Sequence, residues 1–268
     1  MLFIVNPISG SGRKTLIMSH LKRLGLKVVC TEYAGHAEVL ARETDAKVVV
    51  AVGGDGIVNE VLGIIPCGSG DGLALHLGIS RYYRRAIKTI LEGKTTSIDS
   101  ATINGRPFFS VCGVGFDAVV SEKFAKSGKR GLLNYIELGL ETWKEFTPEK
   151  YTINIDGKEW ENDAALITVG NSSQWGNYAK IAPLADISDG LLDITIVDMF
   201  GVVDIPSLSY LLMTGRLDYN HKVHCHRGKH ITIKRKVCGP AHADGDWFNA
   251  ETSIDIKICP KSLKVIVP

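Results

Sequence analysis

The sequence predicts an α/β N-terminal domain with a parallel, doubly wound sheet, and a C-terminal antiparallel β-sandwich domain with helical insertions. In residues 1–94, short apolar strands alternate with amphipathic helices, and three strand-to-helix turns are rich in glycine. Such alternation is typical of a parallel sheet with helices on its faces. In residues 95–268, strand patterns dominate and Asn-Gly or Asp-Gly pairs join several of them. We therefore expect one boundary between residues 94 and 95.

The strands and helices of the first half are predicted from apolar runs and from the residues that end them. An unbroken apolar run in a chain that alternates strand and helix indicates a buried parallel strand, and Gly93 ends the last helix of this half. The predicted strands are 2–5, 26–31, 47–52 and 63–65, and the predicted helices are 13–24, 35–43 and 81–91. Only nine residues separate Gly56 from Pro66, whereas a crossover usually takes about 10–12 or more. Either the crossover helix is trimmed to under two turns, or a loop is missing between Glu60 and Pro66.

The second half is mainly strands. Turn pairs at Asn104-Gly105 and Asp156-Gly157 indicate hairpins. A helical stretch over 117–143 is broken at Ser127-Gly128, and a second helix is expected over 205–213. The predicted strands are 95–103, 108–112, 151–155, 164–169, 192–198, 229–234, 252–258 and 263–267.

The composition is that of an ordinary globular chain. Of 268 residues, 45% are hydrophobic and 22% charged, so a core forms without metal or disulfide support. The net charge of +2 does not by itself point to a polyanionic partner, and we expect no nucleic-acid binding. Six cysteines without a Cys-x-x-Cys pair favour reduced thiols and a cytoplasmic setting. We expect no signal peptide at the N-terminus and no transmembrane segment, because no apolar run approaches ~18 residues.

The segment Gly53-Gly54-Asp55-Gly56 is the strongest chemical signal. It directly follows the strand predicted over 47–52. Glycines at the carboxyl end of such a strand let backbone N–H groups approach phosphate oxygens, since no Cβ intervenes. A carboxylate among them is a suitable partner for a phosphate-bound Mg²⁺. The segment therefore predicts a phosphate site.

Two further glycine-rich turns support this interpretation. Residues 6–14 follow the first strand and open a helix, and residues 66–74 do the same after the strand at 63–65. A glycine-rich turn at a helix N-terminus is a ready anion site. The turn at 6–14 is not a Walker A loop, because the order Gly-Lys-Ser/Thr is absent. The alternative is that the glycines only permit tight turns. This explanation is weaker for three turns at adjacent strand ends than for one.

Together these motifs resemble the diacylglycerol kinase catalytic family of soluble lipid kinases, whose Gly-Gly-Asp-Gly turn is similar to that of NAD kinases and phosphofructokinases. The resemblance runs nearly end to end and implies the same two-domain arrangement. Its motifs are Asn-Pro-x-Ser-Gly at 6–10, Gly-Gly-Asp-Gly-x-x-Asn-Glu at 53–60, Pro-x-Gly-Ser-Gly at 66–70, Gly-Phe-Asp-Ala at 115–118, Asp-Gly-Leu-Leu-Asp at 189–193 and Asp-Gly-Asp at 244–246.

The resemblance implies an ATP site built by the three turns and a threonine that ends the second strand. The chain departs from the family at Ile57, where threonine is usual, which removes one hydroxyl near the phosphates. The implied ATP-binding residues are Asn6, Thr31, Gly53, Gly54, Asp55, Gly56, Ile57, Val58, Asn59 and Ser69.

The resemblance also implies a catalytic base that accepts the proton of the acceptor hydroxyl. In the bacterial branch it is a glutamate in an Asp-Gly-Glu turn, and Asp246 stands there with a side chain shorter by one methylene. In the sphingosine kinase branch the Gly-Gly-Asp-Gly aspartate takes this role, which would be Asp55. Read without the family, Asp244-Gly245-Asp246 is an ordinary hairpin turn.

Two other segments match the family's ligand sites. Residues 186–191 resemble its magnesium loop, with the Asp189 carboxylate and the carbonyls of Asp186 and Leu191 as ligands. The alternative is a surface turn before the strand at 192–198. Asp117 is expected to orient the acceptor head group, or else to cap a helix N-terminus.

Two weaker patterns remain open. His221, His224, His226 and His230 invite a zinc hypothesis, but no metal-binding order supports zinc, and a solvated edge strand is the better explanation. A basic, partly apolar segment at 123–135 suits either an anionic membrane surface or solvated helix positions.

The sequence thus predicts an ATP- and Mg²⁺-dependent lipid kinase that phosphorylates a hydroxyl of diacylglycerol or a sphingoid base. We expect it to be cytoplasmic, to meet its lipid at the membrane surface, and to bind no nucleic acid. A homodimer is left open. The alternatives are an NAD kinase-like phosphotransferase and a nucleotide-binding regulator with weakened catalysis.

Overall fold

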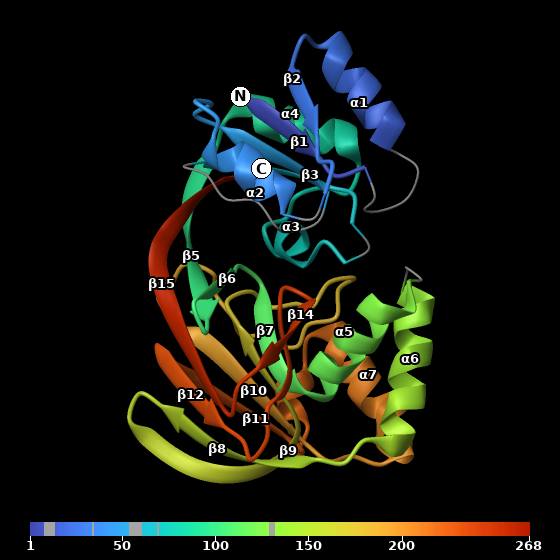
Figure 1. Ribbon diagram of the computed structural model, residues 1–268, viewed down its shortest axis with the longest axis vertical. Coiled ribbons are helices and arrows are strands. Elements are labelled where there is room, and N and C mark those ends of the chain that lie inside the picture. The colour runs from blue at the N-terminus through green and yellow to red at the C-terminus, as the bar shows by residue number, and fades with distance from the viewer. Residues whose placement is uncertain (8–13, 34, 54–60, 69, 129–131) are drawn as a thin grey trace. The chain divides into compact units, whose positions relative to one another are not determined.

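The computed structural model describes residues 1–7, 14–33, 35–53, 61–68, 70–128 and 132–268 (Figure 1). The chain forms two compact units, one of Met1–Ile98 with Lys261–Pro268 and one of Asp99–Pro260. The predicted boundary between residues 94 and 95 stays a prediction; in the structure, residues 95–98 and 261–268 belong to the first unit.

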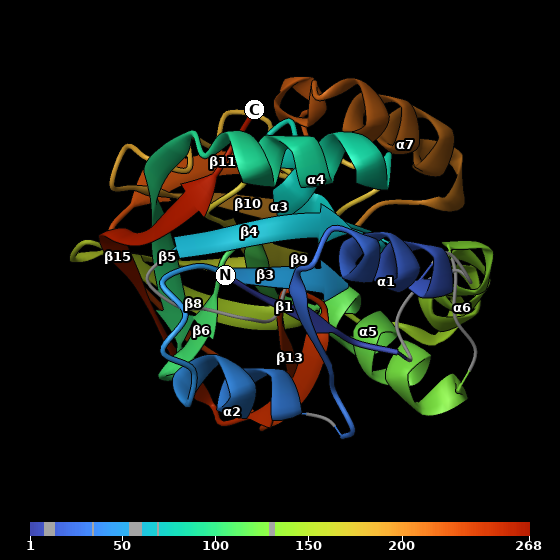
Figure 2. The ribbon, with the colours of Figure 1, turned by 90° about the horizontal axis from the view of Figure 1, so that it is seen from above.

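The first unit contains a parallel sheet in the order β2-β1-β3-β4. The C-terminal part of β15 (Ser253–Ile266) extends it, because Lys264 and Val265 pair in parallel with Val61 and Leu62 of β4. Figure 2 shows β1, β3 and β4 side by side. The strands are β1 (Leu2–Val5), β2 (Lys27–Cys30), β3 (Val49–Gly53) and β4 (Val61–Pro66).

The burial of these strands explains their unbroken apolar sequences. All of β1 and β3 is buried, as a parallel strand covered on both faces requires. Helices pack onto the sheet through apolar stripes, such as Ile17 and Leu21 of α1 and Ile87 and Ile90 of α4. The helices of this unit are α1 (Lys14–Arg23), α2 (His36–Arg42), α3 (Gly72–His76) and α4 (Tyr83–Glu92).

The second unit is an antiparallel β-sandwich. In one sheet, β9 lies between β7 and β10, with β13 and β14 beyond β7 and β11 beyond β10. In the other, β12 lies between β8 and β15. The first half of the long β9 pairs with β8, so this strand belongs to both sheets. The strands are β5 (Thr95–Ile103), β6 (Arg106–Phe108), β7 (Val111–Gly115), β8 (Glu149–Ile155), β9 (Lys158–Gly170), β10 (Leu192–Asp198), β11 (Val223–Gly228), β12 (His230–Lys234), β13 (Gly239–Ala243) and β14 (Asp246–Ala250).

Two apolar clusters hold this unit together. One fills the sandwich between the inward faces of the strands and includes Tyr151, Ile167, Ile194 and Ile233. The other lies against the opposite face of β7, β9 and β10 and is covered by helices. Figure 1 shows α5, α6 and α7 gathered beside the strands of this unit. The helices are α5 (Phe116–Ser127), α6 (Leu132–Glu145), η1 (Val202–Asp204), α7 (Ile205–Thr214) and η2 (Leu217–Tyr219).

The predicted fold class, a parallel α/β domain and an antiparallel β-sandwich with helical insertions, is confirmed. Several details differ. The strand predicted over 108–112 is two strands, β6 and β7, and β13 and β14 were not predicted as strands. The strands predicted over 252–258 and 263–267 are one element, β15, which bends at Lys261, where φ is +50°.

Candidate functional site

The carboxyl ends of the parallel strands meet at one edge of the first sheet. Val5 pairs with Cys30 on one side and with Val52 on the other, and Gly53 pairs with Pro66. The predicted residues that directly follow or end these strands, Asn6, Thr31 and Gly53, are therefore brought to the same edge. Of the other predicted ATP-binding residues, Gly54, Asp55, Gly56, Ile57, Val58, Asn59 and Ser69 lie outside the described residues.

The strand order places a topological switch point between β1 and β3. From β1 the chain moves to β2 on one side, and then crosses back to β3 on the other side of β1. Ligands of open α/β sheets bind outside the carboxyl ends of the strands at such a point. Asn6 and Gly53 stand at this position, with the Asn6 N–H donating to the Val52 carbonyl at 3.2 Å.

The turn after β4 is organised by a buried carboxylate that sequence reasoning did not assign a role. Asp71 accepts the Gly68 N–H at 2.8 Å, and the Arg81 guanidinium donates to it at 3.2 Å and to the Gly70 carbonyl at 2.9 Å. Burial raises the pKa of Asp71, while the Gly68 amide and Arg81 act in the opposite direction. Asp71 and Arg81 thus fix the shape of the glycine-rich turn from inside.

A buried lysine also contributes to this turn. Lys14, the first residue of α1, is only 6% exposed. Its pKa is lowered by burial, while the nearby Cys67 raises it. Burial, with a contribution from Asp71, raises the pKa of the Cys67 thiol to about 11, so the thiol stays protonated at neutral pH. Lys14 and the Cys67 thiol are therefore close enough to interact electrostatically.

In the second unit, the turn that carries Asp246 is tied down by Asp244. The Asp244 carboxylate accepts the backbone N–H groups of Phe109, Ser110 and Val111 at 2.8, 2.8 and 3.0 Å. Asp244 has a φ of +50° and Gly245 a φ of +86°, in the tight turn between β13 and β14. Asp246 is exposed at the first position of β14. The three amide contacts fix the turn and so orient Asp246.

Asp117 lies at the start of α5 and is almost fully buried. Its Oδ1 accepts the Ala118 N–H at 2.8 Å, and its Oδ2 accepts the Thr168 hydroxyl at 2.9 Å and lies 3.1 Å from Nε2 of the buried His242. The geometry joins α5, β9 and β13 through one carboxylate. The predicted role in acceptor binding stays a prediction, and neither Thr168 nor His242 carried a signal in the sequence.

Gly113 leaves the room that this buried contact needs. A Cβ at residue 113 would lie 2.5 Å from Oδ2 of Asp117 and 2.9 Å from Nε2 of His242. We expect Gly113→Ala to lower the free energy of unfolding by about 1–3 kcal/mol, the usual cost of overpacking. Gly139→Ala is the matched control, because nothing lies within 4 Å of its Cβ position on α6. It should be neutral or stabilising. Urea denaturation measures both, and equal effects would contradict the packing explanation.

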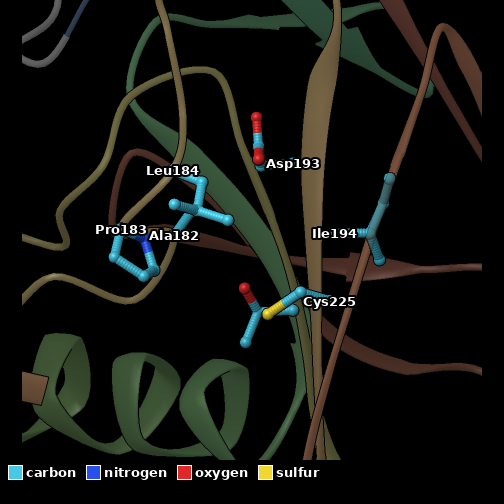
Figure 3. A pocket seen from close by; sticks show the side chains of 7 residues that line it. Ala182, Pro183, Leu184, Asp193, Ile194 and Cys225 are labelled. Atoms are coloured by element: carbon cyan, nitrogen blue, oxygen red, sulfur yellow. The ribbon is translucent and has the colours of Figure 1, made fainter. Parts of the chain in front are cut away.

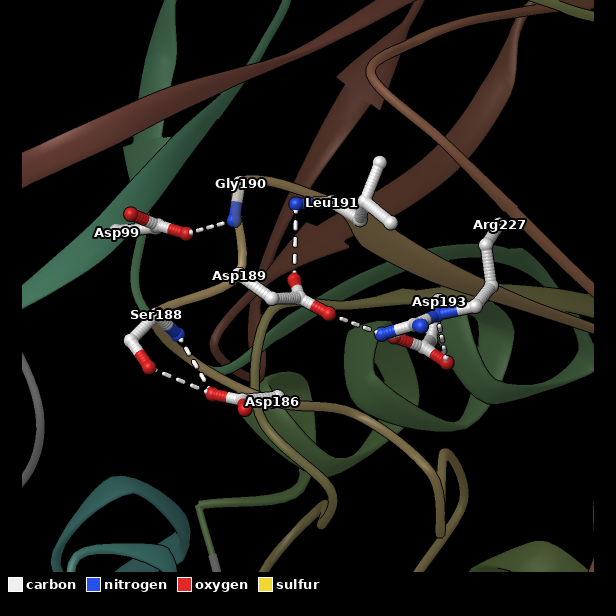
Figure 4. Close-up of polar contacts among 8 residues, drawn as sticks. All are labelled: Asp99, Asp186, Ser188, Asp189, Gly190, Leu191, Asp193 and Arg227. Atoms are coloured by element: carbon white, nitrogen blue, oxygen red, sulfur yellow. Dashed lines mark hydrogen bonds and ion pairs between the residues drawn. The ribbon is translucent and has the colours of Figure 1, made fainter.

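The predicted magnesium loop is closed by protein groups (Figure 4). Asp186 Oδ1 accepts the N–H and hydroxyl of Ser188 at 3.0 and 2.7 Å. Asp189 Oδ1 accepts the Leu191 N–H at 3.0 Å, and its Oδ2 pairs with Arg227. Among the described residues, no group of three His, Cys, Asp or Glu side chains converges to hold a metal. The predicted ligands are one carboxylate and two backbone carbonyls, which is not a set of that kind, so the magnesium role of Asp186, Asp189 and Leu191 stays a prediction.

The histidines of β11 and β12 are bound to other partners. His224 Nε2 lies 2.8 Å from Asp198 and His230 Nε2 lies 2.5 Å from Asp255, while the His226 ring packs on Trp160. In the described part of the chain, these three histidines belong to no group of three or more His, Cys, Asp or Glu side chains that could hold a metal ion. A small cavity beside the same strand is lined by Ala182, Pro183, Leu184, Asp193, Ile194, Thr195 and Cys225 (Figure 3). It is too small for a nucleotide or an acyl chain.

Comparison with known proteins gives the family. The description "Diacylglycerol kinase catalytic domain" matches residues 1–103, and "YegS C-terminal NAD kinase beta sandwich-like domain" matches residues 110–267. The chain belongs to the diacylglycerol kinase catalytic-domain family.

Three curated relatives match this chain over different fractions of its length. A diacylglycerol kinase of Bacillus subtilis is 26% identical over 79% of this chain and 78% of its own length. The probable lipid kinase YegS of Salmonella newport is 30% identical over 58% of both chains. An uncharacterised protein of Synechocystis is 28% identical over 99% of this chain and 69% of its own.

Two solved structures show the same fold as this family member. One is a diacylglycerol kinase from Bacillus anthracis, with a TM-score of 0.75 at 20% identity, covering 100% of this chain and 96% of that one. The other is an NAD kinase from Archaeoglobus fulgidus in complex with ATP, with a TM-score of 0.56 at 13% identity, covering 99% and 92%. At these identities the likeness concerns the fold alone.

Proposed function

We propose that this chain is an ATP-dependent lipid kinase that phosphorylates a hydroxyl of diacylglycerol or a sphingoid base. The observation that carries the proposal is the switch point of the first sheet, where Asn6, Thr31 and Gly53 come to one edge. Membership of the diacylglycerol kinase family supports the reaction type. The names of the relatives from B. subtilis and S. newport support a lipid acceptor.

In the proposed site, backbone donors at the strand ends bind the phosphates of ATP. Thr31 is 8% exposed, and its N–H donates to the Val5 carbonyl at 2.9 Å. This hydrogen bond fixes the Thr31 backbone, and so the point from which its hydroxyl extends, at the carboxyl edge of the sheet. Phosphoryl transfer depends on positioning and on neutralising charge rather than on covalent chemistry. ATP is expected to bind as its Mg²⁺ complex. Asp55 is proposed to face that ion.

Asp246 is proposed as the general base. The acceptor oxygen forms a bond to the γ-phosphorus, the bond from that phosphorus to the bridging oxygen breaks, and ADP leaves with the electron pair. The proton of the hydroxyl passes to the Asp246 carboxylate. The support is a carboxylate at the position of the family's glutamate, exposed on a turn that Asp244 holds rigid. Asp55 is the second candidate for this proton.

The lipid acceptor must be reached from the aqueous side. In the part of the chain that the structure describes, no helix has the length and apolar character needed to cross a membrane. Lys123 and Lys126 of α5 are exposed, and Leu133 of α6 is 83% exposed. These side chains are proposed to meet an anionic membrane surface during turnover. All six cysteines are free, which supports the proposed cytoplasmic setting.

An acceptor panel tests the proposal. The purified chain is incubated with Mg²⁺ and γ-labelled ATP, together with diacylglycerol micelles, sphingosine micelles or NAD. Label in phosphatidic acid or sphingosine phosphate is the expected result. Label in NADP alone would overturn the lipid proposal and favour an NAD kinase-like activity, to which the fold shared with the A. fulgidus enzyme points. Binding of ATP with no transfer to any acceptor would favour a regulator with weakened catalysis.

A further inference from the structure

The loop before β10 concentrates negative charge. Asp186, Asp189 and Asp193 lie within one short segment, and the fully buried Asp99 approaches it from β5. Asp99 Oδ2 accepts the Gly190 N–H at 2.7 Å, and the Asp99 N–H donates to the Ile187 carbonyl at 2.8 Å. These two contacts fix the backbone of the loop. The four carboxylates gathered here repel one another, and a nearby positive charge reduces that repulsion.

Arg227 provides that charge from the neighbouring strand. In the antiparallel pairing of β10 with β11, Arg227 lies directly opposite Asp193. Its Nε lies 3.2 Å from Asp193 Oδ1, and its Nη2 pairs with Asp189 Oδ2 (Figure 4). One planar guanidinium therefore contacts a carboxylate on the strand and another in the loop. A flexible ammonium offers no such fork.

The surroundings strengthen these contacts. The Asp193 side chain is 10% exposed and that of Asp189 is 26% exposed, so water screens them only partly. Burial raises the pKa of Asp193, while Arg227 acts in the opposite direction. A divalent cation placed at Asp189 would lie against the guanidinium and be repelled by it.

We infer that Arg227 is the built-in cation of the 186–193 loop and does at Asp189 what a bound Mg²⁺ does in the loop that this segment resembles. The fold of the second unit is then stable without metal. The inference concerns a structural position, and it is independent of the Mg²⁺ that accompanies ATP and of the lipid kinase proposal.

Thermal unfolding of the full chain without nucleotide tests the inference. The wild type should give the same Tm in excess EDTA and in excess Mg²⁺. In EDTA, Arg227→Met should lower the Tm by about 5 °C. Mg²⁺ should restore part of this loss, because Asp189 and Asp193 then face each other without a counter-charge. The double variant Arg227→Met with Asp189→Asn should lose that response to Mg²⁺.

Lys150→Gln is the matched control. It removes one positive charge from the exposed pair of Lys150 with Glu161, 2.9 Å apart in the same unit. Its Tm should barely change and should not respond to Mg²⁺. A wild-type Tm that rises with Mg²⁺, with Arg227→Met responding no more strongly, would overturn the inference.

A second measurement covers the case in which Arg227→Met does not fold. Electron paramagnetic resonance counts Mn²⁺ bound to the nucleotide-free wild type and to Asp189→Asn. Absence of a tight site in the wild type supports the inference. A stoichiometric Mn²⁺ that Asp189→Asn loses would show that the loop holds a metal after all.

Discussion

Replacing Asp246 by asparagine is expected to lower the turnover number for the lipid acceptor by about 10²–10⁴-fold, the usual contribution of a positioned general base. An amide cannot take the proton that leaves the acceptor hydroxyl. The fold should be unaffected, because Asp246 is exposed at the start of β14. Steady-state assays with the acceptor from the panel, together with the affinity for ATP, give the measurement. The affinity for ATP should stay close to that of the wild type.

Two companion variants sharpen this test. Asp246→Glu restores the family's longer side chain and should retain or increase turnover, which a purely structural role for the turn would not predict. Asp163→Asn removes an exposed carboxylate from β9 in the same unit and should leave turnover unchanged. Full activity of Asp246→Asn would exclude Asp246 as the base and transfer that proposal to Asp55.

Replacing Asp244 by alanine is expected to produce the largest loss of stability, about 3 kcal/mol. The change leaves the N–H groups of Phe109, Ser110 and Val111 without their acceptor, and each unmet buried donor costs about 1–3 kcal/mol. Urea denaturation of the purified variant gives the free energy of unfolding. Asp156→Ala is a suitable control, since Asp156 also accepts backbone N–H groups, from Lys229 and His230, but at an exposed turn. A smaller loss for Asp244→Ala than for Asp156→Ala would contradict the assignment.

Asp244 also predicts how stability changes with pH. Burial raises its pKa to about 6 in the folded protein, against the hydrogen bonds from Phe109, Ser110 and Val111, whereas the ordinary value is 3.8. The folded state therefore holds this proton more tightly. The stabilisation is complete below about pH 4 and is lost as the pH rises through 6, by about 3 kcal/mol. The difference in free energy of unfolding between the wild type and Asp244→Asn isolates this contribution, and a difference that does not change between pH 4 and 7 would refute it.

The sequence predicted well what depends on local patterns. The bounds of β10 agree with the predicted strand at 192–198, and the break at Ser127-Gly128 separates α5 from α6. Both rest on signals within a few residues, namely an apolar run between turns and a glycine with positive φ at a helix end. The parallel order of the first sheet followed from the alternation of strands and helices.

What the sequence could not show were contacts between distant segments. Asp244 binds amides more than 130 residues earlier in the chain, and Asp117 meets His242 across a similar separation. No periodic or turn signal in the sequence marks either of these two contacts. The strands β13 and β14 were missed because Gly239-Pro240 and Asp244-Gly245 resemble loop sequence, although the ladder to β7 pairs them. Arg227 stood out in no motif, since its position opposite Asp193 depends on the register of β11.

The return of residues 261–268 to the first unit has a consequence for biosynthesis. The edge of β4 is covered only when Lys264 and Val265 pair with it, and the Val267 N–H donates to the Lys94 carbonyl at 3.0 Å. A ribosome makes these residues more than 160 positions after Ile98. A nascent chain therefore carries a parallel sheet with an open flank while the whole sandwich is being translated. That interval is when chaperones would have the most to protect.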